Sequence, residues 1–415
     1  MGDKVAQRVD VVDILRGVAL LGIIIVHFMH WHVAGPIPEN IYTARYNAID
    51  LHIKWWCDTL LSDKFILLFS LLFGLSFSLL ISSLEYRDMP IPKIFSWRLL
   101  LLFFIGLIHQ MFWMGDILFI YAILGFFMLF MKKRSDNMLF LAAIFLICNI
   151  PGIALQFGEH SWQTNALTFN TPGAKIKSNI FYDLMQHGTL LDFIRYNLHA
   201  IPGKIKFHIV SGRLFTISGF FLLGLWSGRT HIVSRLKYSP PAKQYRYLAT
   251  GLIACIICYC IHNSLASIWP LVLIKMLADA IKNALIAILY AALVILFFQR
   301  NRFHNWGNGL AAVGKMALTN YLLQTVAGLI LFYPFGLHLF LVTSSVQNLF
   351  LALGVFALQV IFSYYWMKYF LYGPVEWLWR TATYGKRQKI RRATYSKPKH
   401  IPISDAGEQQ MIILP

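Results

Sequence analysis

Long apolar runs separated by short polar connections are the feature that most limits what this chain can fold into. Most runs are close to the length of about 20 residues that an α-helix needs to cross the hydrocarbon core of a bilayer. In the whole chain, 58% of the 415 residues are apolar and only 13% are charged. An average soluble domain is about 45–50% apolar and about 25% charged. The pattern excludes a disordered chain and predicts one polytopic membrane domain.

The apolar runs predict an all-α membrane helix bundle of about ten transmembrane helices. We place the spans at residues 13–33, 60–82, 97–114, 116–131, 138–157, 207–228, 247–268, 272–298, 310–333 and 346–371. Residues 1–380 then form a single transmembrane domain. The tail, 381–415, is basic next to the membrane and polar beyond it, a composition typical of a disordered cytoplasmic segment.

Basic residues are distributed unevenly among the connections and predict the orientation of the chain. There are 37 Lys and Arg against 18 Asp and Glu, a formal charge of +19. In a soluble protein such a charge favours nucleic acid binding. Here the cations follow alternate spans, for example at 132–134, 229–246 and 386–392, whereas the short connection 333–345 carries none. By the positive-inside rule both termini are cytoplasmic, and we expect no nucleic acid partner because the charges anchor the topology.

Two segments predicted on the extracytoplasmic side are long, at residues 34–59 and 158–206. Within the second, Leu184, Leu191 and Leu198 recur at helical spacing among polar residues. This pattern predicts an amphipathic interfacial helix or a lid over a site, and the alternative is a plain surface loop.

Ionisable side chains in the first span are costly in a bilayer, by about 2.5–3.5 kcal/mol each at its centre, and are therefore candidates for function. Asp13 and Arg16 share a helix face, on which they can pair. His27 follows Arg16 by three turns on the same face, about 16 Å along the axis. Imidazole can act as a general base near neutral pH. The alternative is that these groups only cap the helix and bond between helices.

A second candidate group lies at the end of the third span. His109 stands about 16 Å into that helix, at a depth similar to that of His27. Asp116 follows in the tight turn before the fourth span. A carboxylate beside an imidazole suits the abstraction of a proton from a substrate hydroxyl or amine. The alternative is a core histidine with an aspartate that caps a helix.

Four further polar residues are candidates for binding a ligand, namely Lys64, Tyr121, Asn320 and Gln324. Lys64 begins the second span and can instead extend outward to the interface. Asn320 and Gln324 are one helical turn apart, so their amides share a face and either join helices or bind a polar ligand. The sequence has no Walker loop, no zinc-binding His-Glu-x-x-His and no Rossmann fingerprint, and we expect no metal.

Several segments of the chain carry a pattern of their own. They are Asp-Ile-Leu-Arg-Gly-Val-Ala-Leu-Leu-Gly at 13–22, Phe-Ser-Leu-Leu-Phe-Gly at 69–74, Gly-Leu-Ile-His at 106–109, Gly-Asp-Ile-Leu at 115–118, residues 314–324 and residues 373–380. In this order they resemble the YeiB family of bacterial inner-membrane proteins, and the resemblance covers nearly the whole chain. It implies a multi-pass protein surrounded by the lipid of the bacterial inner (plasma) membrane.

The YeiB family is distantly similar to transmembrane acyltransferases, including the heparan glucosaminide N-acetyltransferase. The spacing of Arg16 and His27 is similar to the Arg-x10-His signature of bacterial membrane O-acyltransferases. The resemblance implies that an acyl group passes from cytosolic acyl-CoA, with acetyl-CoA as the expected donor, to an extracytoplasmic hydroxyl or amine. Arg16 and nearby basic loops would meet the phosphates, and His27 or His109 would act as base beside Asp116. YeiB-like sequences often carry Asn at position 27, which favours His109.

Two other functions stay open at this point. Intramembrane Arg, His and Asp serve proton coupling equally well, so a proton-coupled transporter or flippase is an alternative. A non-catalytic membrane partner protein is another. The acceptor (a glycan, a lipid or a small molecule) is not identified by the sequence, and the oligomeric state is left open, a homo-oligomer included.

Overall fold

The structure is a computed structural model that describes residues 2–38, 40–41, 44, 46–158, 172–265, 271–298 and 304–392. This part of the chain is built from α-helices, with one isolated antiparallel bridge between Phe370 and Arg391. The prediction of an all-α fold is therefore confirmed. The predicted disordered tail falls mostly on residues 393–415, which lie outside the described residues.

Each predicted span contains helix in the structure, but the first helix begins eleven residues before the predicted start at 13, and the predicted span 138–157 divides into two helices. The first half of the chain forms α1 (Gly2–Met29), α3 (Ala48–Leu60), α4 (Lys64–Tyr86), α5 (Ile91–Phe112), α6 (Leu118–Met131), α7 (Asp136–Ile147), α8 (Ile150–Gly158), α9 (Pro172–His187) and α10 (Leu190–His199). The second half forms α11 (Ile201–Val210), α12 (Arg213–Thr230), α13 (Ile232–Lys237), α14 (Pro241–Ser264), α15 (Leu271–Phe298), α16 (His304–Lys315), α17 (Ala317–Phe332), α18 (Ser345–Tyr369) and α19 (Pro374–Tyr384). Ser135, Thr189 and Ser344 each cap the helix that follows by accepting a backbone hydrogen bond.

Six helical stretches among the described residues are long and apolar enough to cross a membrane, and two bent helix pairs raise the number to as many as eight. Helices α6 and α7 are apolar but shorter. Large apolar side chains such as Phe130, Phe350 and Leu358 are exposed on the outside of the bundle. Such exposure is unfavourable in water but not against lipid. The chain is therefore a membrane helix bundle, and the number of ten spans with cytoplasmic termini stays a prediction.

Two spans that the sequence predicts as continuous are bent in the structure. Span 207–228 divides into α11 and α12 at an angle of 71°, and span 310–333 divides into α16 and α17 at 86°. The first bend includes Gly212, whose φ of +75° is readily adopted by glycine. The second lies at the buried Met316. The first backbone N–H groups of α17 thus have no partners within that helix and require other ones inside the bundle.

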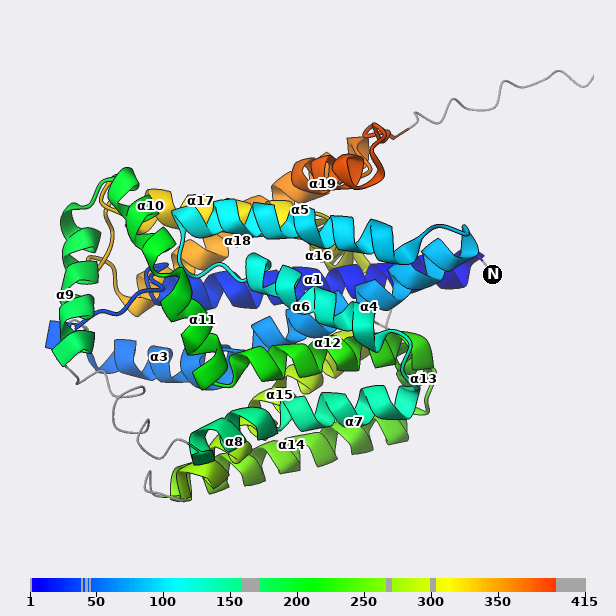
Figure 1. Cartoon of the computed structure of the whole chain (residues 1–415), viewed down its shortest axis with the longest axis horizontal. Helices are drawn as coiled ribbons and strands as arrows, with labels where there is room; N and C mark the ends of the chain where they lie inside the picture. Colours follow the sequence, from blue (N-terminus) through cyan, green and yellow to red (C-terminus); the bar gives the residue numbers. More distant parts are fainter. Residues whose placement is uncertain are drawn as a thin grey trace, which may run out of the picture.

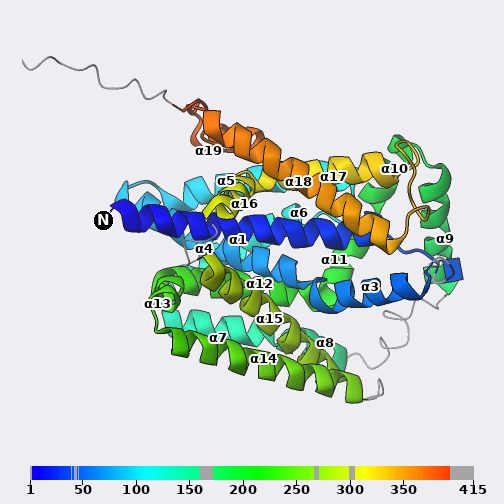
Figure 2. The same ribbon diagram turned by 180° about the vertical axis from the view of Figure 1, so that it is seen from behind.

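Helix α1 runs through the middle of the bundle, with α4, α16 and α18 packed against it (Figures 1 and 2). The crossing of α1 and α16 is close because it is made by glycines. A Cβ at Gly17 would overlap the carbonyl oxygen of Leu310, and one at Gly314 would overlap that of Asp13. The N-terminus and α19 lie at one end of the bundle, and α9 and α10 lie at the other (Figures 1 and 2).

The long segments predicted outside the membrane contain helices. Helix α3 lies within 34–59, and α9, α10 and the start of α11 lie within 158–206. The amphipathic pattern at 183–201 is helical, as two helices rather than one. The reason is local: α10 starts with a capping box in which Thr189 and Asp192 bond reciprocally.

Candidate functional site

His109 and Asp116, predicted as a pair, are in direct contact where α5 turns into α6. Nδ1 of His109 lies 2.6 Å from Oδ1 of Asp116, and its Nε2 lies 2.8 Å from Oγ1 of Thr325 in α17. All three residues are buried. A carboxylate only accepts hydrogen bonds, so in the neutral ring Nδ1 carries the proton and Nε2 accepts from the Thr325 hydroxyl. The basic nitrogen thus faces a hydroxyl, as it does in a general base.

The turn that carries Asp116 is fixed from two directions. Oδ2 of Asp116 accepts from the backbone N–H of Phe119 at 3.1 Å, in the first turn of α6. The ammonium of Lys204 in α11 donates to the carbonyl oxygen of Asp116 and, at 2.5 Å, to Oε1 of Gln110. Gln110 in turn donates to the carbonyl oxygen of Asn197 in α10 at 3.3 Å. Helices α10 and α11 therefore hold the turn on which the His109–Asp116 pair depends.

Two more imidazoles lie close to this pair, around one indole. The ring of His27 is 4.6 Å from that of Trp113 between centroids, and the ring of His32 stacks on Trp113 at 4.3 Å. His109 is 5.9 Å from the same indole. Both ring nitrogens of the fully buried His32 have no hydrogen-bond partner among the described residues. His27 and His109, the two candidate bases, therefore share one aromatic neighbour, but only His109 is held by a carboxylate.

Arg16 in α1 forms the predicted pair with Asp13. Its guanidinium donates to Oδ1 of Asp13 at 2.5 Å and to Oγ of Ser76 in α4 at 2.6 Å. These two bonds use separate nitrogens and hold the guanidinium between α1 and α4. Arg16 is therefore fixed in place and points into the cavity described next.

A cavity of about 420 Å³ lies between α1, α4, α5, α6, α17 and α19. Its lining includes five basic residues, Arg16, Arg87, Arg98, Lys315 and Arg380, and one acidic residue, Glu376. Much of the rest of its lining is apolar and aromatic, with Phe69, Phe73, Phe77, Leu99 and Leu102. The basic residues come from the end of the bundle that holds the N-terminus and α19, which is the end predicted to be cytoplasmic.

The opposite part of the cavity reaches the neighbourhood of the catalytic candidates. Ile117 and Leu118, which follow Asp116 in the chain, line it, and so does Tyr321. The ring of Tyr321 lies 5.1 Å from that of His109 between centroids. Tyr121, a predicted binding residue, also lines the cavity. One cavity thus leads from a group of cations to the side chains next to His109 and Asp116.

The N-terminus of α17 lies beside the same cavity and is capped by a side chain of α19. Oε1 of Glu376 accepts from the backbone N–H of Thr319 at 3.0 Å, and Oε2 accepts from its hydroxyl at 2.6 Å. Burial raises the pKa of Glu376 above the ordinary value, against the opposing effect of these hydrogen bonds. The carboxylate supplies the partners that the bend at Met316 removes.

The structure places the predicted binding residues Asn320 and Gln324 in helix–helix contacts, outside the lining of the cavity. The side chain of Asn320 donates to Oγ of Ser363 at 2.9 Å, and the backbone carbonyl oxygen of Asn320 accepts from the side chain of Gln359 at 2.8 Å. Gln324 donates to Oε1 of Gln359 at 3.1 Å. These amides join α17 to α18.

Lys64, another predicted binding residue, is buried at the start of α4 and also lies outside the cavity lining. Its ammonium donates to the carbonyl oxygen of Asp58 at 3.1 Å. The carboxylate of Asp58 pairs with Lys54 at 2.6 Å and with His30 at 3.2 Å. Lys64 thus belongs to a polar group that joins α3 and α4 to the end of α1.

Sequence reasoning missed Tyr321 and Thr325, each of which directly follows a predicted residue. Tyr321 and Thr325 are one turn apart and share a face of α17, rotated by about 100° from the face of Asn320 and Gln324. The only local signal was a second pair of polar side chains with the same spacing. Which of the two faces meets His109 depends on how α17 packs, and the sequence does not contain that information locally.

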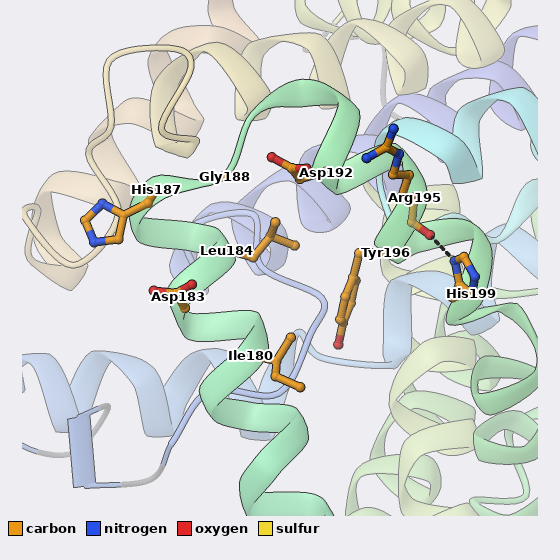
Figure 3. A pocket seen from close by; sticks show the side chains of 9 residues that line it. All are labelled: Ile180, Asp183, Leu184, His187, Gly188, Asp192, Arg195, Tyr196 and His199. Atoms are coloured by element: carbon orange, nitrogen blue, oxygen red, sulfur yellow. Dashed lines mark hydrogen bonds between the residues drawn. The ribbon is translucent and has the colours of Figure 1, made fainter.

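A second hollow, of about 480 Å³, lies between α9 and α10 (Figure 3). Ile180, Leu184 and Tyr196 lie between the two helices, whereas the side chain of His187 points away from α10 (Figure 3). Asp192, which lines this hollow, is engaged in capping α10. Among the described residues, the lining of this hollow contains no buried ion pair like that of His109 and Asp116.

Comparison with known proteins finds one matching family model and relatives that align along nearly their whole length. Residues 227–386 match the family described as protein of unknown function (DUF418). The chain is 27% identical to the uncharacterized protein YxaH of Bacillus subtilis (strain 168) over 404 residues, which cover 94% of this chain and 97% of that protein. It is 29% identical to the uncharacterized protein YeiB of Escherichia coli (strain K12) over 402 residues, 91% of this chain and 96% of that protein.

No solved structure matches the chain. The similarity to YxaH and YeiB extends over more than nine tenths of each sequence, so it includes the α5–α6 turn and α17 together. The resemblance predicted from the segments at 13–22, 106–109 and 314–324 is confirmed: the chain is similar to YxaH and YeiB along nearly its whole length, and residues 227–386 match the DUF418 family model.

Proposed function

We propose that this protein is a bacterial inner-membrane acyltransferase, which transfers an acyl group from cytosolic acyl-CoA to a hydroxyl or amine of an extracytoplasmic glycan, lipid or small molecule. The observation that carries the proposal is the cavity. It joins five basic side chains at one end to the surroundings of an aspartate-bound imidazole at the other. A donor with an anionic head and a reactive group at the end of a long arm fits this distribution.

The basic end supports an acyl-CoA donor, with acetyl-CoA as the simplest one. Phosphates are bound well by guanidinium and ammonium groups, and arginine binds them in a bidentate manner. Arg16 is already oriented by Asp13 and Ser76, so little side-chain freedom is lost when it meets an anion. The apolar and aromatic side chains in the cavity lining suit contact with the pantetheine arm of CoA. No metal is needed for the transfer.

The His109–Asp116 pair supports general base catalysis. Nε2 of His109, once the Thr325 hydroxyl releases it, takes the proton from the acceptor hydroxyl or amine while the acceptor oxygen or nitrogen attacks the thioester carbonyl carbon. The carbon–sulfur bond then breaks, and the CoA thiolate leaves with the proton that His109 returns. The products are an ester or amide and free CoA. Asp116 stabilises the imidazolium that forms in between.

His109 is a better base candidate than His27 for a structural reason. The carboxylate of Asp116 fixes the proton of His109 on Nδ1 and thereby presents Nε2 as an acceptor. His27 contacts Trp113 and His32 through ring faces and edges. From its position beside Trp113, His27 would line the path by which the acceptor reaches His109.

A proton-coupled transporter is the second candidate, and the helix breaks favour it. Transporters commonly bind their substrates where a spanning helix is interrupted near the middle of the membrane. Here α16 and α17 meet at 86° beside the cavity, and α11 and α12 meet at 71°. A non-catalytic partner protein is the third reading.

The test uses the full chain reconstituted in lipid vesicles. Binding of CoA is measured by calorimetry, and acetyl-CoA cleavage is measured as release of free thiol, with water and with a panel of sugars, amines and lipids as acceptors. We expect micromolar to millimolar binding in the wild type and in H109A, and loss of cleavage in H109A only. H199A is the matched control, since His199 is exposed on α10 and bonds only to the carbonyl oxygen of Arg195.

Absence of CoA binding by the wild type contradicts the enzyme reading. Uptake of a solute driven by a proton gradient, and abolished in D116N, would instead establish the transporter. If H109A and D116N leave every such activity and the growth of a complemented strain unchanged, the non-catalytic reading is the one that remains.

A further inference from the structure

Two tyrosines line the cavity near the His109–Asp116 pair, and their hydroxyls are in different situations. The hydroxyl of Tyr121 donates to the carbonyl oxygen of Ile66 at 2.9 Å and lies 2.6 Å from Oγ of Ser70. The hydroxyl of Tyr321 is buried; its oxygen faces the backbone N–H of Ile117, and no group among the described residues accepts its proton. Buried donors are normally paired, so a hydroxyl in a cavity wall whose proton has no acceptor indicates a group that a ligand completes.

Tyr321 lies between the cavity and the candidate base. Its side chain lines the cavity, and its ring contacts that of His109 at 5.1 Å between centroids. Thr325, one turn further along α17, bonds to Nε2 of the same imidazole. A ligand atom that reaches the Tyr321 hydroxyl from the cavity therefore arrives beside His109.

The geometry points to the Tyr321 hydroxyl as the donor that binds the carbonyl oxygen of the thioester of the acyl donor. This inference rests on the proposed acyl transfer. It identifies the thioester carbonyl as the group that lies at the end of the cavity beside His109. When the acceptor attacks the carbonyl carbon, the carbonyl oxygen gains negative charge, and its hydrogen bond to Tyr321 strengthens. As the carbon–sulfur bond breaks, the carbonyl re-forms and the charge leaves with the thiolate, which takes the proton from His109.

The experiment compares Y321F with the wild type in the thiol-release assay in lipid vesicles. Loss of one donor to an oxyanion lowers kcat by about 10²–10³-fold, and we expect this fall with KM and CoA affinity within about twofold. The pH profile of kcat, which His109 determines, keeps its midpoint. Y290F is the matched control, because the Tyr290 hydroxyl in α15 bonds to the carbonyl oxygen of Leu60 outside the cavity lining. It leaves kcat and KM unchanged.

Stability gives an independent readout, since the Tyr321 hydroxyl donates no hydrogen bond within the described residues and its removal costs at most the contact with the Ile117 N–H. Y321F should therefore unfold at a temperature close to that of the wild type. A kcat of Y321F within threefold of the wild type, with thiol release intact, overturns the role of Tyr321 and leaves the proposed acyl transfer standing. Failure of the wild type to bind CoA overturns the proposed function itself, and the two failures are therefore distinguishable.

Discussion

The carboxylate of Asp116 lies 2.6 Å from Nδ1 of His109, across a turn of seven residues, with both side chains buried. The contact sets the tautomer of the imidazole and directs Nε2 towards Thr325. A carboxylate in this position stabilises the protonated ring during proton transfer without being protonated itself. The pair is therefore the first target for substitution.

Replacement of Asp116 by Asn should lower kcat by about 10³–10⁴-fold, since an amide does not fix the proton on Nδ1 and does not stabilise an imidazolium. CoA binding should stay within twofold, because Asp116 is not part of the basic end of the cavity. Thiol release and calorimetry measure the two quantities. D192N is the control, as Asp192 caps α10. Equal rates for D116N and the wild type would exclude the pair from catalysis.

Replacement of Arg16 by Gln should weaken CoA binding by about 10–100-fold, as expected for the loss of a charge-assisted hydrogen bond. The effect should shrink at high salt, because screening weakens the attraction between Arg16 and the phosphates, which is the interaction that R16Q lacks. Calorimetry with desulfo-CoA, which cannot react, measures the affinity. R195Q is the control, since Arg195 lies at the hollow between α9 and α10. An unchanged affinity of R16Q would show that the phosphates do not bind at this end of the cavity.

Replacement of Gly314 by Ala should destabilise the protein by about 1–3 kcal/mol, as overpacking does in a close contact. The new methyl group would overlap the carbonyl oxygen of Asp13 and push α16 away from α1. The measurement is the midpoint of thermal unfolding in detergent micelles. In G354A the new methyl group meets no atom within 4 Å, and this control should be neutral or more stable by about 0.5–1 kcal/mol. Equal midpoints for G314A and G354A would contradict the close helix crossing.

Glu376 should give the stability a pH dependence. Its pKa is raised by burial, so the folded state favours the protonated carboxyl. This contribution is complete below the ordinary glutamate pKa of about 4.3 and is lost as the pH rises through the raised value. Unfolding midpoints of the wild type should therefore fall over that range, and the fall should be smaller in E376Q, which does not titrate. Parallel curves for the two proteins would show that Glu376 is not the group responsible.

The helices and the nearest pairs followed from local sequence. Apolar runs of spanning length leave the α-helix as the only structure that satisfies its own backbone in lipid, so the all-α bundle was predictable. Asp13 and Arg16 are one turn apart, and His109 and Asp116 are joined by a tight turn. Contacts across so few residues need only regular helix geometry, which explains why both pairs were found.

The tertiary structure decided the rest. The apolar pattern continues through Met316, so periodicity gave no sign of the 86° bend, and the bend is satisfied by Glu376, which lies 57 residues beyond Thr319. Thr325 meets His109 across 216 residues of chain. In lipid, apolar surfaces on every side of a helix are equally satisfied, so the sequence determines that helices form, whereas the packing of a few polar and small side chains determines which faces meet.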